Sequence, residues 1–414
     1  MGKRARLVQA FAWMLAFYVS TSSARAQAST PVVIPVGSFP QGAATDPVST
    51  TALVTNAGDN TVSVIDLVNA RVTATLVNIP TPAGVCFNAS GLAVVANRSN
   101  NSVTVVEVAA RRILGVVNVG TAPIGVAVHP GSNVAVVANS LGNSVSLVDV
   151  ASSPPRLLAT IDGIPNAVGI QSVAVDPDLN VAAVASSTTN SLFIVDLASR
   201  RISRQIPVEQ SPWSVAIEPS SKTAVVANLN SNSVSLIDLR TYTVRATVPS
   251  IPTPQAVAIG PSAQSALVTT GTNATLQVVN LPAAAVETTV SNLPNAGSVA
   301  FHPSTGRTIV VLPNSNSAAV IASLGLFSSV NAASFAGGPV APSSIASGFG
   351  SSLAASTAWA TAVPLPWALA DVSVRVGGVP APLFFVSPQQ VNYQVPRLGA
   401  GTYAVQVFRA GQQV

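Results

Sequence analysis

One phrase recurs along most of this sequence at a nearly constant interval. Its clearest copy reads Val136-Val137-Ala138-Asn139, then three residues, then Asn143-Ser144-Val145-Ser146-Leu147-Val148-Asp149. The positions equivalent to Asp149 are Asp66, Glu107, Asp196, Asp238 and Asn280, so successive copies lie 41, 42, 47, 42 and 42 residues apart. A seventh, more divergent copy ends at Ile321. A fixed period of about 20 to 50 residues is the signature of a repeat architecture, so we expect seven copies of one structural unit.

Each unit has the pattern of four short β-strands. In the third copy, residues 125–128, 133–138, 144–149 and 157–161 are rich in Val, Ile, Leu and Ala and are separated by Gly, Asn and Pro. About 40 to 45 residues in four strands is the length of one blade of a β-propeller. We therefore expect an all-β chain whose main part, residues 30–323, is a seven-bladed β-propeller.

The ends of the repeat region predict how the ring closes. After Ile321 no outermost strand of normal length follows in the seventh unit. Residues 32–36, followed by Gly37, match the outermost-strand pattern at residues 116–120. A strand from the N-terminal side would remove an open sheet edge from the last blade. We expect residues 32–36 to pair with residues 318–321.

Two asparagines flank the turn between the second and third predicted strands, as Asn139 and Asn143 do in the third copy. A short amide side chain can hydrogen-bond the local backbone and tolerates a positive φ angle. We therefore interpret the repeated asparagines as turn residues rather than ligand-binding residues.

The repeated phrase Val-Ala-Asn-x3-Asn-Ser-Val-Ser-Leu-Val-Asp is followed by Gly-x2-Pro-x-Gly-Val-Ala-Val-x-Pro. Together they resemble the YVTN repeat family of β-propellers. Thr55-Asn56 keeps the family's terminal Thr-Asn, whereas later copies read Ala-Asn. The resemblance covers residues 30–323 and implies the propeller fold. It leaves the function open, because such propellers include surface-layer, cofactor-associated and lyase-like members.

The N-terminus has the pattern of an export signal. Basic residues within the first six positions precede the largely apolar residues 7–19, and Ala24-Arg25-Ala26 supplies a small-x-small cleavage site. A buried first helix or a membrane anchor is the alternative, but the Ser/Thr-rich stretch that follows comes too early for a membrane span. We expect residues 1–26 to be a signal peptide and the mature chain to be secreted or periplasmic.

Composition excludes several classes of protein for the mature chain. Hydrophobic residues make up 48% and charged residues 8%, but past residue 19 no apolar run approaches the length of about 18 residues that a spanning helix needs. Without the leader, the chain has 15 basic and 14 acidic residues, and this small net charge does not favour binding to nucleic acid. We expect no transmembrane span after leader removal and no nucleic-acid partner. We expect a monomer that binds an unknown protein or glycan of the cell envelope.

Repeat position argues against catalytic or metal roles for the reactive side chains. Cys86, the only cysteine, occupies a slot that holds alanine in the other copies, so we interpret it as a small buried hydrophobe. The alanines are Ala44, Ala127, Ala174, Ala216, Ala258 and Ala300. His129 and His302 occupy a slot that elsewhere holds Asp46, Asp176, Glu218 and Gly260, which we interpret as a solvated turn. The two histidines belong to units that are not neighbours, so we expect no shared metal.

The repeated acids at the ends of the third strands belong to different units and should lie too far apart to act as an acid–base pair. The sequence also lacks the Cys-x-x-Cys-His motif of haem attachment. We therefore expect no cofactor, no metal and no catalytic residues.

One slot varies in a way that favours ligand binding. We call the residue at the start of each innermost strand a mouth residue, because these residues should ring the mouth of the central channel, on the face of the Asn-rich turns. They are Gln41, Ala83, Ile124, Gln171, Trp213, Gln255 and Gly297. Gln41, Gln171, Trp213 and Gln255 could hydrogen-bond and stack a polar ligand. The alternative is that these residues vary as loop residues do, without function.

After Leu324 the period stops. Short strands are expected at residues 371–376, 382–386, 391–395 and 402–408, joined by Gly- and Pro-containing turns, which suggests a β-sandwich-like module over residues 327–414. Residues 330–335 and 379–388 resemble an uncharacterised C-terminal domain of acidobacterial secreted proteins. Those domains extend beyond the length present here, so we expect a partial copy.

The sequence therefore predicts an exported, non-catalytic binding scaffold rather than an enzyme. The alternative is a propeller enzyme of lactonase or lyase type that acts at the channel mouth. That alternative would need a His/carboxylate set or a metal at the mouth.

Overall fold

The computed structural model describes residues 19–20, 28–164, 169–261, 264–322, 324, 327–331, 345–350, 353–361, 364–398, 401–402 and 405–414. Over these residues the chain is nearly all β, and the helical elements among them are the 3₁₀ turns η1 (Arg98–Asn100) and η2 (Pro313–Ser315). The chain divides into two compact units. One is Ala28–Leu324, and the other is Met1–Gln27 with Gly325–Val414.

The larger unit contains seven four-stranded antiparallel sheets in its described residues. Sheet 1 is β3 (Pro40–Thr45), β4 (Thr51–Asn56), β5 (Thr61–Asp66) and β6 (Arg71–Leu76), and sheet 2 is β7 (Pro82–Phe87), β8 (Leu92–Asn97), β9 (Ser102–Glu107) and β10 (Arg112–Asn118). Sheet 3 is β11 (Pro123–His129), β12 (Val134–Asn139), β13 (Ser144–Asp149) and β14 (Arg156–Asp162), and sheet 4 is β15 (Ile170–Asp176), β16 (Val181–Ser186), β17 (Ser191–Asp196) and β18 (Arg201–Pro207).

The remaining sheets continue the pattern. Sheet 5 is β19 (Pro212–Glu218), β20 (Thr223–Asn228), β21 (Ser233–Asp238) and β22 (Thr243–Val248), and sheet 6 is β23 (Pro254–Ile259), β24 (Ser265–Thr270), β25 (Thr275–Asn280) and β26 (Ala285–Val290). Sheet 7 is β27 (Val299–His302), β28 (Arg307–Leu312) and β29 (Ser317–Ile321), completed by β2 (Val32–Pro35).

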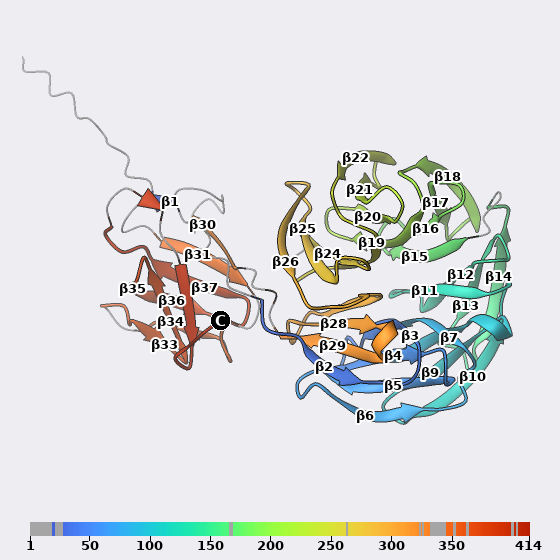
Figure 1. Cartoon of the computed structure of the whole chain (residues 1–414), viewed down its shortest axis with the longest axis horizontal. Coiled ribbons are helices and arrows are strands. Elements are labelled where there is room, and N and C mark those ends of the chain that lie inside the picture. The colour runs from blue at the N-terminus through green and yellow to red at the C-terminus, as the bar shows by residue number, and fades with distance from the viewer. Residues whose placement is uncertain are drawn as a thin grey trace, which may run out of the picture. The chain divides into compact units, whose positions relative to one another are not determined.

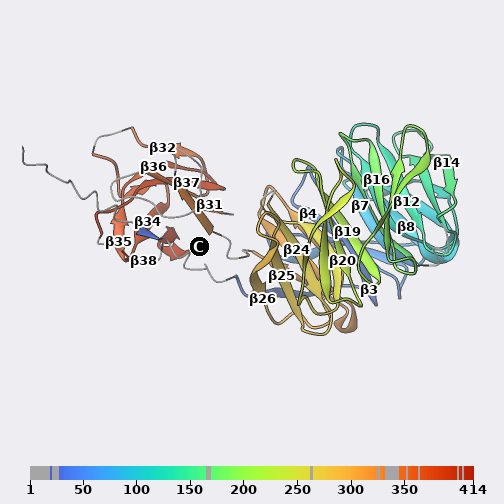
Figure 2. The same ribbon diagram turned by 90° about the horizontal axis from the view of Figure 1, so that it is seen from above.

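The first strand of each sheet packs against the first strand of the next. These contacts run from β3 through β7, β11, β15, β19, β23 and β27 and return to β3. Figures 1 and 2 show the sheets of this unit side by side in a ring. A closed ring of four-stranded sheets around a central channel is the arrangement of a β-propeller.

The middle strands of the sheets are mostly buried, and β8 and β9 are buried along nearly their whole length. Both faces of a sheet pack against neighbouring sheets, which explains the continuous Val/Ile/Leu/Ala runs. Between sheets 2 and 3, for example, Val94, Val103 and Val105 share one cluster with Ala135 and Val137. Full burial of a valine stabilises the fold by about 1.5 to 3 kcal/mol, so each sheet depends on its neighbours for stability.

The predicted ring closure is confirmed. β2 pairs antiparallel with β29, with Val32 opposite Val320 and Ile34 opposite Ala318. Ile34 also enters the apolar cluster shared by sheets 7 and 1. A strand from the N-terminal side of the ring therefore covers the edge that β29 would otherwise expose.

The repeated asparagines are structural, as expected, but the first of each pair ends a buried strand and bonds hydroxyl groups, whereas the second is the turn residue. The side chain of Asn139 is fully buried, and its Nδ2 donates to the hydroxyls of Ser144 and Ser146, each at 3.0 Å. Asn56, Asn97 and Asn228 make the same pair of bonds. The second asparagine takes a positive φ, which is 50° at Asn101. Its Oδ1 accepts the backbone N–H of Ala122 at 2.9 Å and so joins the turn to the start of the next unit.

The second unit contains two five-stranded sheets in its described residues. One is β30 (Phe327–Asn331), β31 (Ile345–Gly350), β37 (Gln390–Gln394), β36 (Leu383–Val386) and β32 (Ala358–Trp359). The other is β33 (Ala368–Leu369), β34 (Val372–Val376), β39 (Val405–Arg409) and β40 (Gln412–Gln413), with β35 (Val379–Ala381) beside β34, and β1 (Val19–Ser20) pairs separately with β38 (Gly401–Thr402). Val374 and Val407 share a buried cluster with Val391 and Tyr393, so this unit has a core of its own.

Candidate functional site

A cavity of about 610 Å³ lies where the innermost strands of the ring begin. All seven mouth residues line it, namely Gln41, Ala83, Ile124, Gln171, Trp213, Gln255 and Gly297. Arg98, Ser140 and Pro313, which follow the second strands of their sheets, also line it. The mouth residues and the Asn-rich turns therefore share one face of the ring, as predicted.

A backbone irregularity positions most of the mouth residues. In sheets 3 to 6 the pairing register of the first two strands shifts at one residue, which is Ile124, Gln171, Trp213 or Gln255. Sheets 1 and 2 have the same extra residue near Gln41 and Ala83. A bulge of this kind places one side chain outside the normal alternation of the strand and re-aims it. The fold thus directs the mouth residues toward the cavity.

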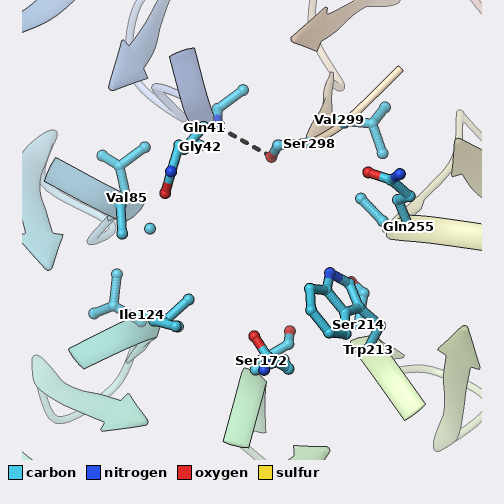
Figure 3. Close-up of a pocket in the computed structure, with 18 of the residues that line it drawn as sticks. Gln41, Gly42, Val85, Ile124, Ser172, Trp213, Ser214, Gln255, Ser298 and Val299 are labelled. Carbon is cyan, nitrogen blue, oxygen red and sulfur yellow. Dashed lines mark hydrogen bonds between the residues drawn. The ribbon is translucent and has the colours of Figure 1, made fainter. Parts of the chain in front are cut away.

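The cavity wall is chemically uneven. Gln171, Trp213 and Gln255 come from three consecutive sheets, and Trp213 is 37% exposed. Figure 3 shows Trp213 and Gln255 side by side, with Ile124 and Val85 on another part of the wall. The first strands of sheets 2 and 3 thus supply an apolar part of the wall. Arg98 carries the single charge among the lining residues that the structure describes.

Hydrogen bonds just below the mouth join neighbouring sheets. The hydroxyl of Ser298 accepts the backbone N–H of Ala43 at 3.1 Å (Figure 3). Ser172 and Ser214 accept in the same way from the next sheet, at 3.2 and 3.1 Å. These serines each follow a mouth residue, and the equivalent residue in sheet 1 is Gly42, which has no hydroxyl. There the hydroxyl of Thr55 accepts the N–H of Gly42 at 2.8 Å and donates to the carbonyl of Ala83 in sheet 2 at 2.5 Å. The rim therefore has a fixed geometry before any ligand binds.

The polar mouth side chains are not used in hydrogen bonds within the ring. Within the described part of the chain, the amides of Gln41, Gln171 and Gln255 and the indole N–H of Trp213 have no protein hydrogen-bond partner. An amide offers two donors and an acceptor, so each glutamine can bind a polar group of a ligand.

The slot that holds His129 and His302 is buried, which corrects the prediction of a solvated turn. The exposed fraction is 9% at His129, 1% at His302 and 0% at Asp176. These residues and their equivalents, which we call turn-slot residues, are Asp46, Asn88, His129, Asp176, Glu218, Gly260 and His302. They lie at the ends of the innermost strands opposite the mouth, and Asn88, Asp176 and His302 bond to groups of the adjacent sheet there.

Hydrogen bonds to the turn that follows offset the cost of burying the polar turn-slot residues. The Nδ1 atom of His302 accepts the N–H of Thr305 at 3.2 Å, and its Nε2 lies 2.7 Å from the carbonyl oxygen of Ser49 in the next sheet. Because a carbonyl only accepts, Nε2 carries the proton. His129 likewise accepts the N–H groups of Gly131 and Ser132 through Nδ1.

Neighbouring groups also stabilise the charges of Asp176 and Glu218. Lys222 is 7% exposed, and its Nζ lies 3.0 Å from Asp176 Oδ1 and 2.5 Å from Asp178 Oδ2, which joins sheets 4 and 5. Burial acts to lower the pKa of Lys222, but the two carboxylates outweigh it and the pKa is raised. Burial acts to raise the pKa of Glu218, but hydrogen bonds from Ser221 and Ser220 outweigh it and the pKa is lowered.

The remaining reactive groups lie apart from one another. Cys86 is half-buried against the apolar cluster that contains Val94 and Ala135, and burial raises the pKa of its thiol far above the ordinary value. Over the described residues, no three His, Cys, Asp or Glu side chains are grouped closely enough to hold a metal ion. No helix in the described ranges is long and apolar enough to cross a membrane.

No protein-family model and no curated protein matches this sequence. Solved structures do match it. Hydrazine synthase of Kuenenia stuttgartiensis, which contains a β-propeller, superposes with a TM-score of 0.61 at 18% sequence identity, over 68% of this chain and 95% of that chain. At this identity the likeness concerns the fold alone, and it supports a propeller-like fold for the ring of sheets.

Proposed function

We propose that this protein is an exported, non-catalytic binding scaffold of the cell envelope. Its ring is a seven-bladed β-propeller of the YVTN type, followed by a β-sandwich-like module, and its partner is held at the mouth cavity. The alternating repeat phrase supports the family, and the leader pattern of residues 1–26 supports export.

One observation carries the proposal: the seven mouth residues converge on one cavity, and the polar side chains among these seven are unpartnered within the described residues. The rim beneath them is held by bonds such as that between Ala43 and Ser298. Variable side chains on a rigid frame are the usual construction of a binding site.

The chemistry of the lining favours binding over catalysis. Glutamine amides, a tryptophan and Arg98 can hydrogen-bond, stack and attract an anion, whereas proton transfer needs a group such as His or a carboxylate in reach of the substrate. The histidines, Asp176 and Glu218 lie at the opposite ends of the innermost strands, where the turns use their bonding capacity.

Binding to glycans and to fractionated envelope proteins tests the proposal. We would compare the purified wild-type chain with the double variant Trp213→Ala/Gln255→Ala. Trp359→Ala is the matched control, since Trp359 is 65% exposed in the other unit. The proposal expects at least one partner that the double variant loses and the control keeps, and that is recovered chemically unchanged. A partner converted to product would support the lactonase or lyase alternative, and no partner that depends on the mouth would overturn the proposal.

The export part of the proposal has a separate test. Intact-mass measurement of the chain isolated from the envelope or medium should give the mass expected for cleavage after Ala26. A retained leader would contradict it.

A further inference from the structure

We infer that the mouth binds the neutral pyranose ring of a saccharide on Trp213, between Gln171 and Gln255. This inference rests on the proposed function and narrows it to one class of ligand. It concerns the part of the cavity formed by β15, β19 and β23, the first strands of sheets 4, 5 and 6.

The three residues occupy the same slot in consecutive sheets. β15 contacts β19 and β19 contacts β23, so the side chains at this slot lie next to one another along the rim. Trp213 is at the centre with a glutamine on each side. Each residue sits at a register shift, so the backbone aims all three into the same cavity.

The chemistry of this part of the rim matches a sugar ring. A pyranose has an apolar C–H face and an edge of hydroxyl groups, each of which donates and accepts hydrogen bonds. The indole of Trp213 offers a large flat apolar surface that is 37% exposed, and stacking would cover it. The two flanking amides offer donors and acceptors together, as hydroxyl groups require.

The absence of ionised groups among the described residues of this part of the rim favours a neutral ligand. Arg98 comes from sheet 2, three sheets away from Trp213 in the ring. A charged group placed on Trp213 would lose water without gaining a counter-charge, which is unfavourable. A neutral hydroxyl loses little free energy, because a hydrogen bond to an amide replaces its hydrogen bond to water.

The position of Gln255 is set by a glycine. A Cβ atom at Gly271 would overlap the Nε2 of Gln255, so the amide lies directly against the glycine backbone. The slot after the second strand holds Ala57, Arg98, Ser140, Ser187, Leu229 and Pro313 in the other sheets. Sheet 6 therefore makes room for this glutamine where its neighbours carry side chains.

Calorimetric titration of the full-length chain tests the inference. The probes are maltohexaose, cellohexaose, mannohexaose and galactohexaose, with a galacturonic acid hexamer as the charged counterpart. We expect one or more neutral probes to bind more tightly than the acidic hexamer. Trp213→Ala should weaken that binding at least tenfold, and Gln171→Ala or Gln255→Ala should each weaken it by about three- to tenfold.

Gly271→Ala is a finer probe, because it keeps both glutamines and the tryptophan and only displaces the Gln255 amide. It should weaken binding by about threefold. Trp359→Ala and Gln389→Ala, which alter exposed residues of the other unit, are the controls and should leave affinity unchanged. Circular dichroism melting of each variant separates a loss of binding from a loss of folding.

The outcomes distinguish this inference from the proposed function. If a protein or the acidic hexamer binds and Trp213→Ala abolishes that binding, while no neutral hexasaccharide binds, the proposed scaffold function stands and the inference of a neutral sugar ligand is overturned. A neutral probe whose affinity falls in Trp359→Ala but not in Trp213→Ala would place the site elsewhere and overturn the inference. No binding at the mouth by any class would overturn both.

Discussion

Both ends of the innermost strands carry polar residues but use them in opposite ways. At the mouth, the amides of Gln41, Gln171 and Gln255 are unpartnered within the described residues and half-buried. At the other end, Asp176 and His302 are almost fully buried, and each is bonded to its own turn and to the next sheet. Polar composition therefore does not identify a site in this ring. What distinguishes the mouth is access to a ligand: its unpartnered amides line the cavity, whereas Asp176 Oδ2, which also has no hydrogen-bond partner, is buried at the other end.

The largest expected effect is at the turn-slot end. Asp176→Ala should lower the free energy of unfolding by about 3 kcal/mol, because it leaves the buried Lys222 with one carboxylate and removes acceptors from two backbone N–H groups. Urea unfolding followed by circular dichroism measures the change. A loss no larger than that of Gln255→Ala would mean that the two ends do not differ as argued.

The second-largest expected effect is the pH dependence of stability at the turn-slot end. The folded pKa of Glu218 lies below its ordinary value of 4.5, so its ionised form stabilises the fold above that pH, and this contribution disappears as the pH falls through the folded pKa. Glu218→Gln should lower stability at pH 7 by about 1.5 kcal/mol, since an amide cannot accept from both Ser220 and Ser221 as the carboxylate does. The difference from wild type should shrink on acidification. A difference that stays constant from pH 7 to pH 3 would contradict this account.

The comparison applies to the ring alone only if the second unit does not stabilise it. Deletion of residues 327–414 should change the free energy of unfolding of the ring by less than about 0.5 kcal/mol, because the two units have separate cores. Scanning calorimetry of the deleted and full-length chains checks this. A drop of several degrees in the melting temperature of the ring would show that the units share stabilising contacts.

The smallest effect on stability should be at the mouth. Trp213→Ala should change the free energy of unfolding by less than about 0.5 kcal/mol, because the indole is exposed and bonded to nothing in the described chain. The same variant should lose binding. Thermal melting and the titrations above, measured on one preparation, give both values. A strongly destabilised Trp213→Ala would mean that the tryptophan is a structural residue like those at the opposite end.

The repeat pattern was sufficient to predict the strands, the closing strand and the position of the mouth residues. These features depend on local signals, namely alternation of apolar residues and turns marked by Asn, Gly and Pro. The burial of His129 and His302 was missed because a slot that accepts His, Asp, Glu and Gly resembles an exposed turn. What the polar members share is an acceptor for turn N–H groups, and the burial itself comes from the adjacent sheet, which is distant in sequence.

The second unit was predicted less completely. The expected strands at 371–376, 382–386, 391–395 and 402–408 correspond to β34, β36, β37 and, from Val405 on, β39. β31 (Ile345–Gly350) was missed because its sequence, rich in Gly, Ala and Ser, carries no strand signal of its own. Its pairing with β37 stabilises a strand conformation that its own residues do not favour.

The register shift at the start of the innermost strands separates the mouth residues from the strand pairing that holds the ring together. A residue in a bulge is outside the ladder, so its replacement leaves the pairing of Gly125 with Ala138, or of Ser214 with Ala227, intact. The mouth positions can therefore vary almost independently of the core that supports them. A library randomised at Gln41, Ile124, Gln171, Trp213 and Gln255 should retain the fold in most members. The same frame could thus acquire new specificities, by evolution or by selection in the laboratory, without any change in its packing.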